Sequence, residues 1–399
     1  MSPRPLLPGG HDRAGTAGVH LGGHDQLGAA ARLSSESFQP ASALESGQPY
    51  GQAGTVRIGL PLQYAGDVRA AADQVRDLES AGLDMVWVAE VYGLDGVSLL
   101  GYLAATTERI GLGSAILNVY SRTPALLAQV AAGLDTVSGG RFELGLGASG
   151  PQVIEGWHGV PYTQPVTRTR ETVLLIRRML AREEIVHEGK VFTLPLPPDQ
   201  GTGLGKPLKM LAHPVRPRVP IHVASLGEKN VAMTAEVADG WLPIFFLPER
   251  AHEIWGEALA AGRAKRGDDL GELDVIAGGA LAIAEGEQRR QLLDGLRHFY
   301  ALYIGGMGAK GRNFYNDLAV RYGYGDVAAT IQDLYLDKRK DEAAALIPDE
   351  LLELTNLVGS PGFIQERIAA FREAGVTTLN VTPVGDAPAL IEQVKDWAG

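Results

Sequence analysis

Residues 109–159 read RIGLGSAILNVYSRTPALLAQVAAGLDTVSGGRFELGLGASGPQVIEGWHG. The stretch predicts a buried strand, a helix with Thr123 as its N-cap and Pro124 in its first turn, a second buried strand and a glycine-rich exit loop. Successive strands joined by a helix belong to a parallel sheet, so the exit loop is expected at its carboxyl edge, where cofactors bind. The apolar stripe expected to face the sheet comprises Leu126, Leu127, Val130 and Leu134.

The same alternation continues on both sides of this stretch, from Thr55 to the end of the chain. Eight units of a short apolar run and a longer amphipathic run can be counted, and no long interdomain linker separates them. This pattern predicts an α/β fold, a closed (β/α)8 TIM barrel with insertions, over residues 55–399. Within it we expect one seventh strand over residues 273–283, a hairpin that turns at Gly189, an irregular insertion from about Tyr300 to Val358, and a last helix capped by Asp386.

Composition bounds the class of protein and its partners. Hydrophobic residues make up 45% and charged residues 21% of the chain, and no apolar run approaches the ~18 residues of a membrane span. A net charge of −11 repels phosphate backbones, so nucleic acid and membranes are set aside in favour of a small-molecule substrate. The absence of cysteine excludes disulfides, thiolate nucleophiles and cysteine-ligated metals, and it fits a cytoplasmic location.

The first 54 residues differ in composition from the rest. They are rich in Gly, Ala, Ser, Pro and His and show neither a helical period nor the basic start and apolar core of a secretion signal. We expect a disordered N-terminal extension over residues 1–54. Its scattered histidines are more often solvated than ligating, so no metal site is predicted.

Glycines at 145, 147 and 150 spell G-x-G-x-x-G, with Glu171 about twenty residues on. A Rossmann fingerprint is rejected because this is the fourth unit of the chain and Glu171 lies inside a helical pattern. The glycines instead permit close backbone approach to a flat ring or polyol, with Ser149 supplying a hydroxyl. A tight barrel turn is the alternative.

A second helix amino terminus follows the fifth strand, in the segment VASLGEKN (223–230). The backbone N–H groups of Ser225, Leu226 and Gly227 there suit a phosphate, unless Ser225 simply caps the helix. Positive charge gathers just before this strand and suits an anionic ligand tail, or else a solvated loop. The residues concerned are Lys206, Lys209, His213, Arg216 and Arg218.

Candidate proton-handling groups follow strands two and four. Glu90 closes the second strand and is either a proton donor or acceptor or a salt-bridge partner. His158, beside Trp157, is either a proton donor or a packed, hydrogen-bonded histidine. Six of the twelve tyrosines fall within residues 300–335, which suits a pocket wall, a lid or a dimer contact.

Three segments carry a resemblance to a known family: SGPQVIEGWHG (149–159), ALYIGGMGAKGRNFYNDLAVRYGYG (301–325) and DLYLDKRKDEAAALIPDE (333–350). From Val56 to its end the chain resembles the luciferase-like flavin and deazaflavin oxidoreductases, specifically the branch that depends on coenzyme F420 and includes methylenetetrahydromethanopterin reductase. The resemblance implies a bacterial-luciferase-like TIM barrel, hydride transfer between the deazaflavin and a small organic substrate, and a homodimer.

The resemblance also implies where the coenzyme binds. In the family, a bulge in the third strand carries a non-prolyl cis peptide that backs the ring, and GSAILNVYSR (113–122) is similar to that segment. Phosphate contacts map onto the turn after strand five, and a further loop follows strand four. The positions implied are Ala115, Ile116 and Asn118 at the bulge, Ala148, Ser149 and Gly150 after strand four, and Ala224, Ser225, Leu226 and Gly227 after strand five.

Two alternatives stay open. The first is an FMN-dependent monooxygenase of the same family, which consumes oxygen where a deazaflavin enzyme does not. The second is a catalytically idle barrel that binds cofactor or a partner, because Glu90 and Val91 stand where several relatives have Asp-His.

Overall fold

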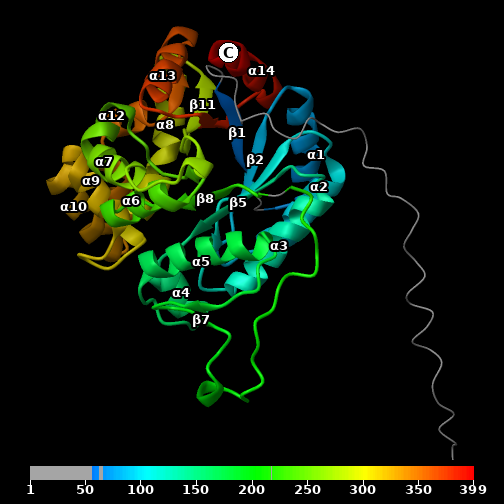
Figure 1. Ribbon diagram of the computed structural model, residues 1–399. Helices are drawn as coiled ribbons and strands as arrows, with labels where there is room; N and C mark the ends of the chain where they lie inside the picture. The colour runs from blue at the N-terminus through cyan, green and yellow to red at the C-terminus, as the bar shows by residue number, and fades with distance from the viewer. Residues whose placement is uncertain (1–55, 63–65, 217) are drawn as a thin grey trace, which may run out of the picture. The chain divides into compact units, whose positions relative to one another are not determined.

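The computed structural model describes residues 56–62, 66–216 and 218–399, so the N-terminal extension predicted over residues 1–54 lies outside the described residues. Parallel strands close into a barrel, as the alternation predicts: the sheet order is β3-β2-β1-β13-β10-β9-β8-β5, and β3 pairs with β5 (Figure 1). The barrel strands are β1 (Arg57–Leu62), β2 (Met85–Val88), β3 (Gly111–Ser114), β5 (Phe142–Gly147), β8 (Ile221–Ala224), β9 (Gly240–Trp241), β10 (Asp274–Ala277) and β13 (Thr378–Asn380).

Helices between the strands cover the outside of the barrel, each with an apolar stripe toward the sheet. The predicted caps are confirmed, since Thr123 accepts the N–H of Leu126 and Asp386 accepts the N–H of Ala389. None of the helices in the described ranges is long and apolar enough to cross a bilayer. The outer helices are α1 (Val68–Ser80), α2 (Gly96–Thr106), α3 (Pro124–Val137), α5 (Pro165–Leu180), α6 (Glu228–Val237), α7 (Pro248–Arg263), α13 (Pro361–Glu373) and α14 (Ala387–Ala398).

The stripe predicted for α3 needs one correction. Leu127 and Leu134 are buried, whereas Leu126 is 45% exposed. Leu126 lies about 100° around the helix from Leu127 and is exposed like Val137, whereas Val130 is partly buried against the core, as predicted. Both sides of the helix carry apolar residues at the helical period, and the sheet covers one of them.

The third strand is interrupted as the family resemblance predicts. After β3 the peptide bond between Ala115 and Ile116 is cis, and the chain resumes as β4 (Leu117–Asn118), which pairs with β5. The predicted bulge and its cis peptide are therefore confirmed.

The expectation of one seventh strand over residues 273–283 is wrong. The chain turns at Gly278 and Gly279, between β10 in the barrel and β11 (Ala280–Ile283), which joins β12 (Leu357–Gly359) and β14 (Thr382–Pro383) in a separate parallel sheet. Backbone from elsewhere closes on both glycines: a Cβ at Gly278 would lie 2.2 Å from the carbonyl oxygen of Asn380, and one at Gly279 2.3 Å from that of Thr355. Apolar alternation alone does not reveal this change of partners.

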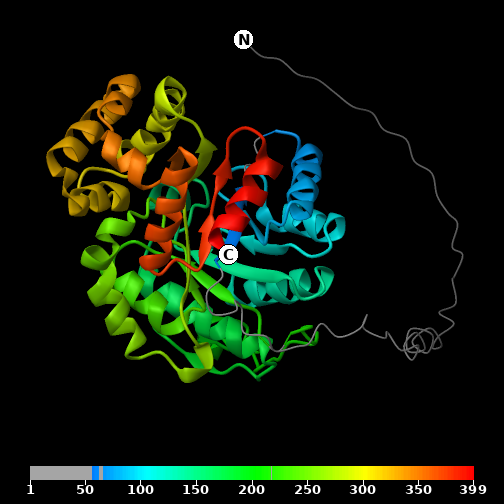
Figure 2. The same cartoon turned by 90° about the horizontal axis from the view of Figure 1, so that it is seen from above.

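The expectation of an irregular insertion is also wrong, because the segment is mostly helical. Its glycines read as helix breakers, yet Gly305 and Gly306 lie where the ring of Tyr335 packs, and a Cβ at either would approach that side chain to 2.5 Å or less. Figure 2 shows these helices grouped on one side of the barrel. They are α8 (Gly286–Ala301), the π-helical turn η3 (Leu302–Gly306), α9 (Phe314–Ala319), the π-helical turn η4 (Val320–Tyr324), α10 (Gly325–Leu336), α11 (Lys340–Ala345) and α12 (Asp349–Leu354).

The hairpin predicted around Gly189 is confirmed as β6 (His187–Glu188) and β7 (Thr193–Leu194). Glu171 lies inside α5, as expected, and its carboxylate accepts the N–H of Lys190 at 2.8 Å and of Phe192 at 2.9 Å. A Cβ at Gly189 would lie 2.3 Å from Glu171 Oε2, so the carboxylate can approach the turn only because residue 189 has no side chain. Short elements complete the fold: α4 (Pro151–Gly156) and the 3-10 turns η1 (Pro198–Gln200) and η2 (Asp268–Leu270).

Candidate functional site

The predicted cofactor residues come from neighbouring strand ends at the carboxyl rim of the barrel. Asn118 of β4 is in register with Gly147 of β5, and Gly147 is in register with Ala224 of β8. A Cβ at Gly147 would lie 3.1 Å from Ile116 Cγ1 and 3.4 Å from Ala224 Cβ, so the bulge and the two exit loops are in near contact. The structure thus brings together the three segments that the sequence assigned to one ligand.

Asn118 and His158, predicted for different roles, meet at this rim. Asn118 Nδ2 lies 3.3 Å from His158 Nε2. Asn118 Oδ1 accepts the N–H of Tyr120 at 3.1 Å and of Ser121 at 2.7 Å, which fixes the orientation of the amide. The amide nitrogen therefore donates to His158 Nε2, and a neutral imidazole in this arrangement carries its proton on Nδ1.

The exit loop of β5 has an unusual backbone at Ser149. Ala148 is buried, Ser149 has φ of 57°, and the Ser149 carbonyl accepts the hydroxyl of Tyr162 at 3.2 Å. Gly150 then starts α4 with no side chain capping the helix. The left-handed residue turns the chain sharply at the strand end.

The turn after β8 leaves the first amides of α6 without a side-chain cap. Ser225 is buried, and its Oγ lies 2.9 Å from Thr234 Oγ1, so the alternative that Ser225 caps the helix is wrong. The carbonyls of Ser225 and Leu226 accept the indole N–H groups of Trp241 and Trp255, each at 2.9 Å, and these bonds fix the turn. A Cβ at Gly227 would meet nothing within 4 Å, so space is open in front of the helix.

Glu90 is engaged in an ion pair at the end of β2. Its Oε1 accepts from Arg122 Nη1 at 2.5 Å, and its Oε2 accepts from Arg122 Nη2 and from the N–H of Gly96, each at 2.8 Å. The carboxylate raises the pKa of Arg122 by hydrogen bonding and by charge. Of the two roles that the sequence left open for Glu90, the geometry supports the salt-bridge partner.

Two of the cations before β8, Arg216 and Arg218, lie at the other end of the barrel. Arg216 pairs with Asp135 at 2.6 Å, and Arg218 pairs with Asp239 at 2.6 Å, both near the amino end of the strand. Because a parallel strand carries its exit loop at the opposite end, these two arginines do not reach a ligand at the carboxyl rim. These ion pairs argue against an anionic tail held by Arg216 and Arg218, while a binding role for Lys206, Lys209 and His213 stays a prediction.

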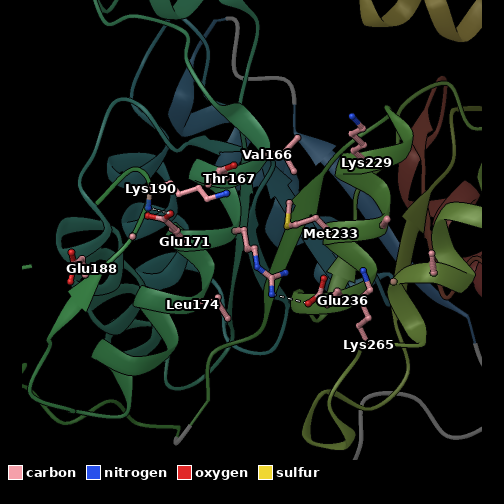
Figure 3. A pocket seen from close by; sticks show the side chains of 15 residues that line it. Val166, Thr167, Glu171, Leu174, Glu188, Lys190, Lys229, Met233, Glu236 and Lys265 are labelled. Carbon is pink, nitrogen blue, oxygen red and sulfur yellow. Dashed lines mark hydrogen bonds and ion pairs between the residues drawn. The ribbon is translucent and has the colours of Figure 1, made fainter. Parts of the chain in front are cut away.

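A cavity of about 810 Å³ lies outside the barrel, between α5, the β6–β7 hairpin, α6 and α7 (Figure 3). The ion pair of Arg170 with Glu236, at 2.7 Å, crosses it, and Lys190, Lys229 and Lys265 stand at its edges. No lining residue comes from a barrel strand. This cavity is therefore separate from the rim where the predicted cofactor residues meet.

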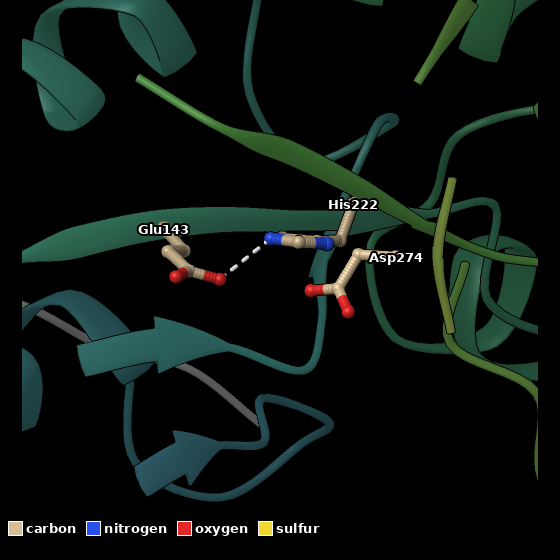
Figure 4. A group of neighbouring side chains, drawn as sticks. All are labelled: Glu143, His222 and Asp274. Atoms are coloured by element: carbon tan, nitrogen blue, oxygen red, sulfur yellow. Dashed lines mark ion pairs between the residues drawn. The ribbon is translucent and has the colours of Figure 1, made fainter. Parts of the chain in front are cut away.

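Sequence reasoning missed a cluster of charged side chains at the floor of the barrel, near the amino ends of its strands (Figure 4). Arg57 Nη1 lies 2.8 Å from Glu143 Oε1, His222 Nε2 lies 2.7 Å from Glu143 Oε2, and Arg57 also pairs with Asp274. One potential ligand atom each from Glu143, His222 and Asp274 lies within 4.8 Å of the others, with the Arg57 guanidinium bonded to both carboxylates. The sequence signal that could have identified this cluster is a charged or titratable residue inside each apolar run that is predicted as a strand.

The floor cluster shifts the pKa of its members in opposite directions. Burial alone would raise the pKa of Glu143, but Arg57 and His222 outweigh it and hold the pKa well below its usual range. Burial alone would lower the pKa of His222, but the hydrogen bond and charge of Glu143 raise it. Each partner thereby stabilises the charged form of the other.

The sequence was compared with family models and with known proteins, and it is similar to members of one family. The family model described as luciferase-like monooxygenase matches residues 50–378. A protein of Mycobacterium tuberculosis, provisionally named a coenzyme F420-dependent oxidoreductase, is 40% identical over 346 residues, which cover 86% of this chain and 98% of the relative.

Solved structures share the fold at lower identity. The coenzyme F420-dependent tetrahydromethanopterin reductase from Methanopyrus kandleri superposes with a TM-score of 0.70 at 22% identity and covers 86% of this chain and 97% of its own. A type II Baeyer-Villiger monooxygenase from Pseudomonas putida in complex with FMN superposes with a TM-score of 0.57 at 20% identity, covering 86% of this chain and 98% of its own.

Proposed function

Because the chain belongs to the luciferase-like monooxygenase family, we propose that this oxidoreductase transfers a hydride between coenzyme F420 and a small organic substrate. The relative of Mycobacterium tuberculosis, which is matched along almost its whole length, supports the choice of coenzyme. The observation that carries the proposal is the meeting of the bulge and two exit loops at three adjacent strand ends.

The residues at the rim fit such a coenzyme. The bulge at Ala115 and Ile116 would back the ring, and the small side chains of Gly147 and Ala224 leave room for close approach. The uncapped amides of α6, with open space at Gly227, would hold the phosphate. The deazaflavin, when bound, supplies a ring carbon that accepts or donates a hydride.

The chain itself contributes orientation and a proton-handling group. Asn118 is fixed by two backbone N–H groups and holds the ring of His158, which we assign to moving the proton at its imidazole nitrogens. Glu90 acts indirectly, because it orients Arg122 and caps the start of α2. Glu90 is therefore a positioning residue in this proposal.

An FMN-dependent monooxygenase is the second candidate, and the description of the matching family model favours it. The test is equilibrium binding of the purified protein to coenzyme F420 and to FMN, together with oxygen uptake in the presence of the reduced cofactor. We expect micromolar or tighter affinity for coenzyme F420 and no oxygen uptake. Tight binding of FMN alone would replace the first candidate by the second, and binding of neither would favour the idle barrel.

A second copy of the chain is the expected protein partner. Helix α2 contains no charged residue, and the one charged residue of α3, Asp135, is buried against Arg216. Their outer surface instead exposes Tyr102, Leu126 and Val137. We propose that this uncharged surface forms a homodimer contact, and sedimentation of the purified chain as a monomer at micromolar concentration would contradict it.

A further inference from the structure

Aromatic side chains from the insertion pack against the loop after β9. Phe245, whose φ is 54°, lies with its ring centroid 5.3 Å from that of Tyr303 and 6.2 Å from that of Tyr315. The ring centroid of Tyr303 lies 4.8 Å from that of Tyr315 and 4.8 Å from that of Phe299. Several of these pairs meet edge to face, the favoured geometry of packed rings, and the four residues are called the aromatic wall below.

The aromatic wall stands at the carboxyl rim and faces the loops of other strands. Tyr162, whose hydroxyl bonds the Ser149 carbonyl in the predicted cofactor loop, is close enough to Tyr315 to raise its pKa. Tyr92, which follows β2, acts in the same way on Tyr303. The wall is thus placed between the loops after β2, β5 and β9, beside the position proposed for the coenzyme ring.

Two phenol groups of the aromatic wall have no hydrogen-bond partner within the described ranges: those of Tyr303 and Tyr315. Other tyrosines of the same insertion are satisfied. The hydroxyl of Tyr300 lies 2.6 Å from Thr355 Oγ1, and that of Tyr322 donates to the Phe245 carbonyl at 2.8 Å. Neither phenol oxygen is among the buried polar atoms that lack a partner, so solvent reaches both hydroxyls and they are available to donate to a ligand at the rim.

The surroundings of these phenols are uncharged. Burial raises the pKa of Tyr303 and of Tyr315, and the other contributions come from neighbouring tyrosines rather than from an ionised side chain. Both groups therefore remain protonated donors at neutral pH. A phosphate or carboxylate placed against them would lose hydration without gaining a counter-cation, because no cationic side chain contributes to the pKa of either phenol.

We propose that the substrate is an uncharged, flat carbonyl compound that packs on the aromatic wall with its carbonyl oxygen hydrogen-bonded to Tyr303 and Tyr315. This inference rests on the proposed function for the hydride. In the reduction, the carbonyl carbon gains the hydride of the reduced coenzyme, and the π electron pair moves to the oxygen. The oxygen takes the phenol proton of Tyr315, a proton from water reaches the phenolate through His158, and the coenzyme is left oxidised.

Three small molecules test this substrate assignment, and two of them each differ from the first by one chemical group. Acetophenone carries the carbonyl, 4-acetylbenzoate adds a negative charge, and α-methylstyrene replaces the carbonyl oxygen by a methylene group. Dissociation constants are measured by ligand-observed NMR on the full chain with and without oxidised coenzyme F420. We expect 4-acetylbenzoate to bind at least about tenfold more weakly than acetophenone, because its carboxylate is desolvated without a partner.

Two variants and a matched control test the phenols. Tyr303→Phe and Tyr315→Phe each remove one hydroxyl and keep the ring, and we expect each to weaken acetophenone binding about 3- to 10-fold while leaving α-methylstyrene binding unchanged. Tyr335→Phe, in the same insertion but packed on Gly305 and Gly306, should change neither. Unchanged coenzyme affinity in all three variants shows that the rim is intact.

Several outcomes would overturn the proposal: failure of acetophenone to bind, equal or tighter binding of 4-acetylbenzoate, or equal loss of acetophenone and α-methylstyrene in the tyrosine variants. Loss of coenzyme binding by the unmodified protein is a separate outcome. If the probes still discriminate in that case, the proposed function fails and the assignment of the aromatic wall stands.

Discussion

The floor and the rim of the barrel differ in how their polar groups are paired. At the floor, Arg57, Glu143, His222 and Asp274 are inside the protein and bonded to one another across the barrel. At the rim, the amides of α6 have no side-chain cap and two phenols have no partner in the described part of the chain. Paired buried charges keep strands in register, whereas donors that solvent or open space reaches are available to a ligand. The difference indicates that the two ends serve stability and binding respectively.

The largest expected effect on stability comes from removing one charge of the cluster at the floor. Glu143→Gln removes the anion that Arg57 and His222 share, and breaking a buried ion pair by removing one partner costs about 3–5 kcal/mol. Denaturant unfolding should show this loss in the free energy of unfolding. The matched control is Asp73→Asn, which breaks the exposed pair of Asp73 with Arg76 and should cost about 0.5 kcal/mol or less. Equal effects at the two sites would mean that the floor pairs contribute no more than surface pairs.

The next effect tests the rim without touching the fold. Gly227→Glu places a carboxylate where the phosphate is proposed, and we expect coenzyme F420 to bind about 100-fold more weakly, because like charges repel at close range. Gly227→Ala is the control: φ is −73° and a Cβ meets nothing within 4 Å, so affinity and stability should be unchanged. Unaltered affinity in the glutamate variant would remove the phosphate from α6.

The pH dependence of the free energy of unfolding should come from the titratable groups of the floor and not from those of the rim. The raised pKa of His222 contributes stability that is fully present below about pH 6.5 and is lost as pH rises through the folded value. The lowered pKa of Glu143 contributes stability that is present above about pH 4.5 and is lost as pH falls. These two groups therefore favour a maximum between those limits, with slopes of at most about 1.4 kcal/mol per pH unit and proton.

Thermal unfolding of the wild type and of His222→Asn across this range checks the sign. The variant should lose the decline on the alkaline side that belongs to His222. An identical alkaline decline in both proteins would assign it to other groups.

The smallest expected effect concerns the ion pair at the rim. Glu90→Gln weakens the bonds to Arg122 and Gly96, and we expect a loss of about 1 kcal/mol in the free energy of unfolding. In a double-mutant cycle with Arg122→Gln, the two losses should be coupled rather than additive. A Glu90 variant with undiminished stability would instead favour the proton-handling role that the sequence left open.

The rim was predicted from sequence more fully than the floor. Glycine-rich exits, the Asn118 segment and the α6 turn are contiguous motifs, so their local pattern and the family resemblance were sufficient to identify them. The pairing of Asn118 with His158 was not predicted, because forty residues separate them and only the barrel brings them to 3.3 Å. The insertion was misread in part because two of its glycines, Gly305 and Gly306, are packing sites for Tyr335 and not breaks.

Local chemistry determined the elements of this protein: the alternating apolar runs, the caps at Thr123 and Asp386, and the hairpin at Gly189 depend on neighbours a few residues apart. The tertiary structure alone decided which stripe of α3 is buried, where β10 passes into β11, and that Arg57 meets Glu143 across the barrel. Those outcomes depend on strand register and barrel closure, which couple residues far apart in the chain and leave no period in the sequence.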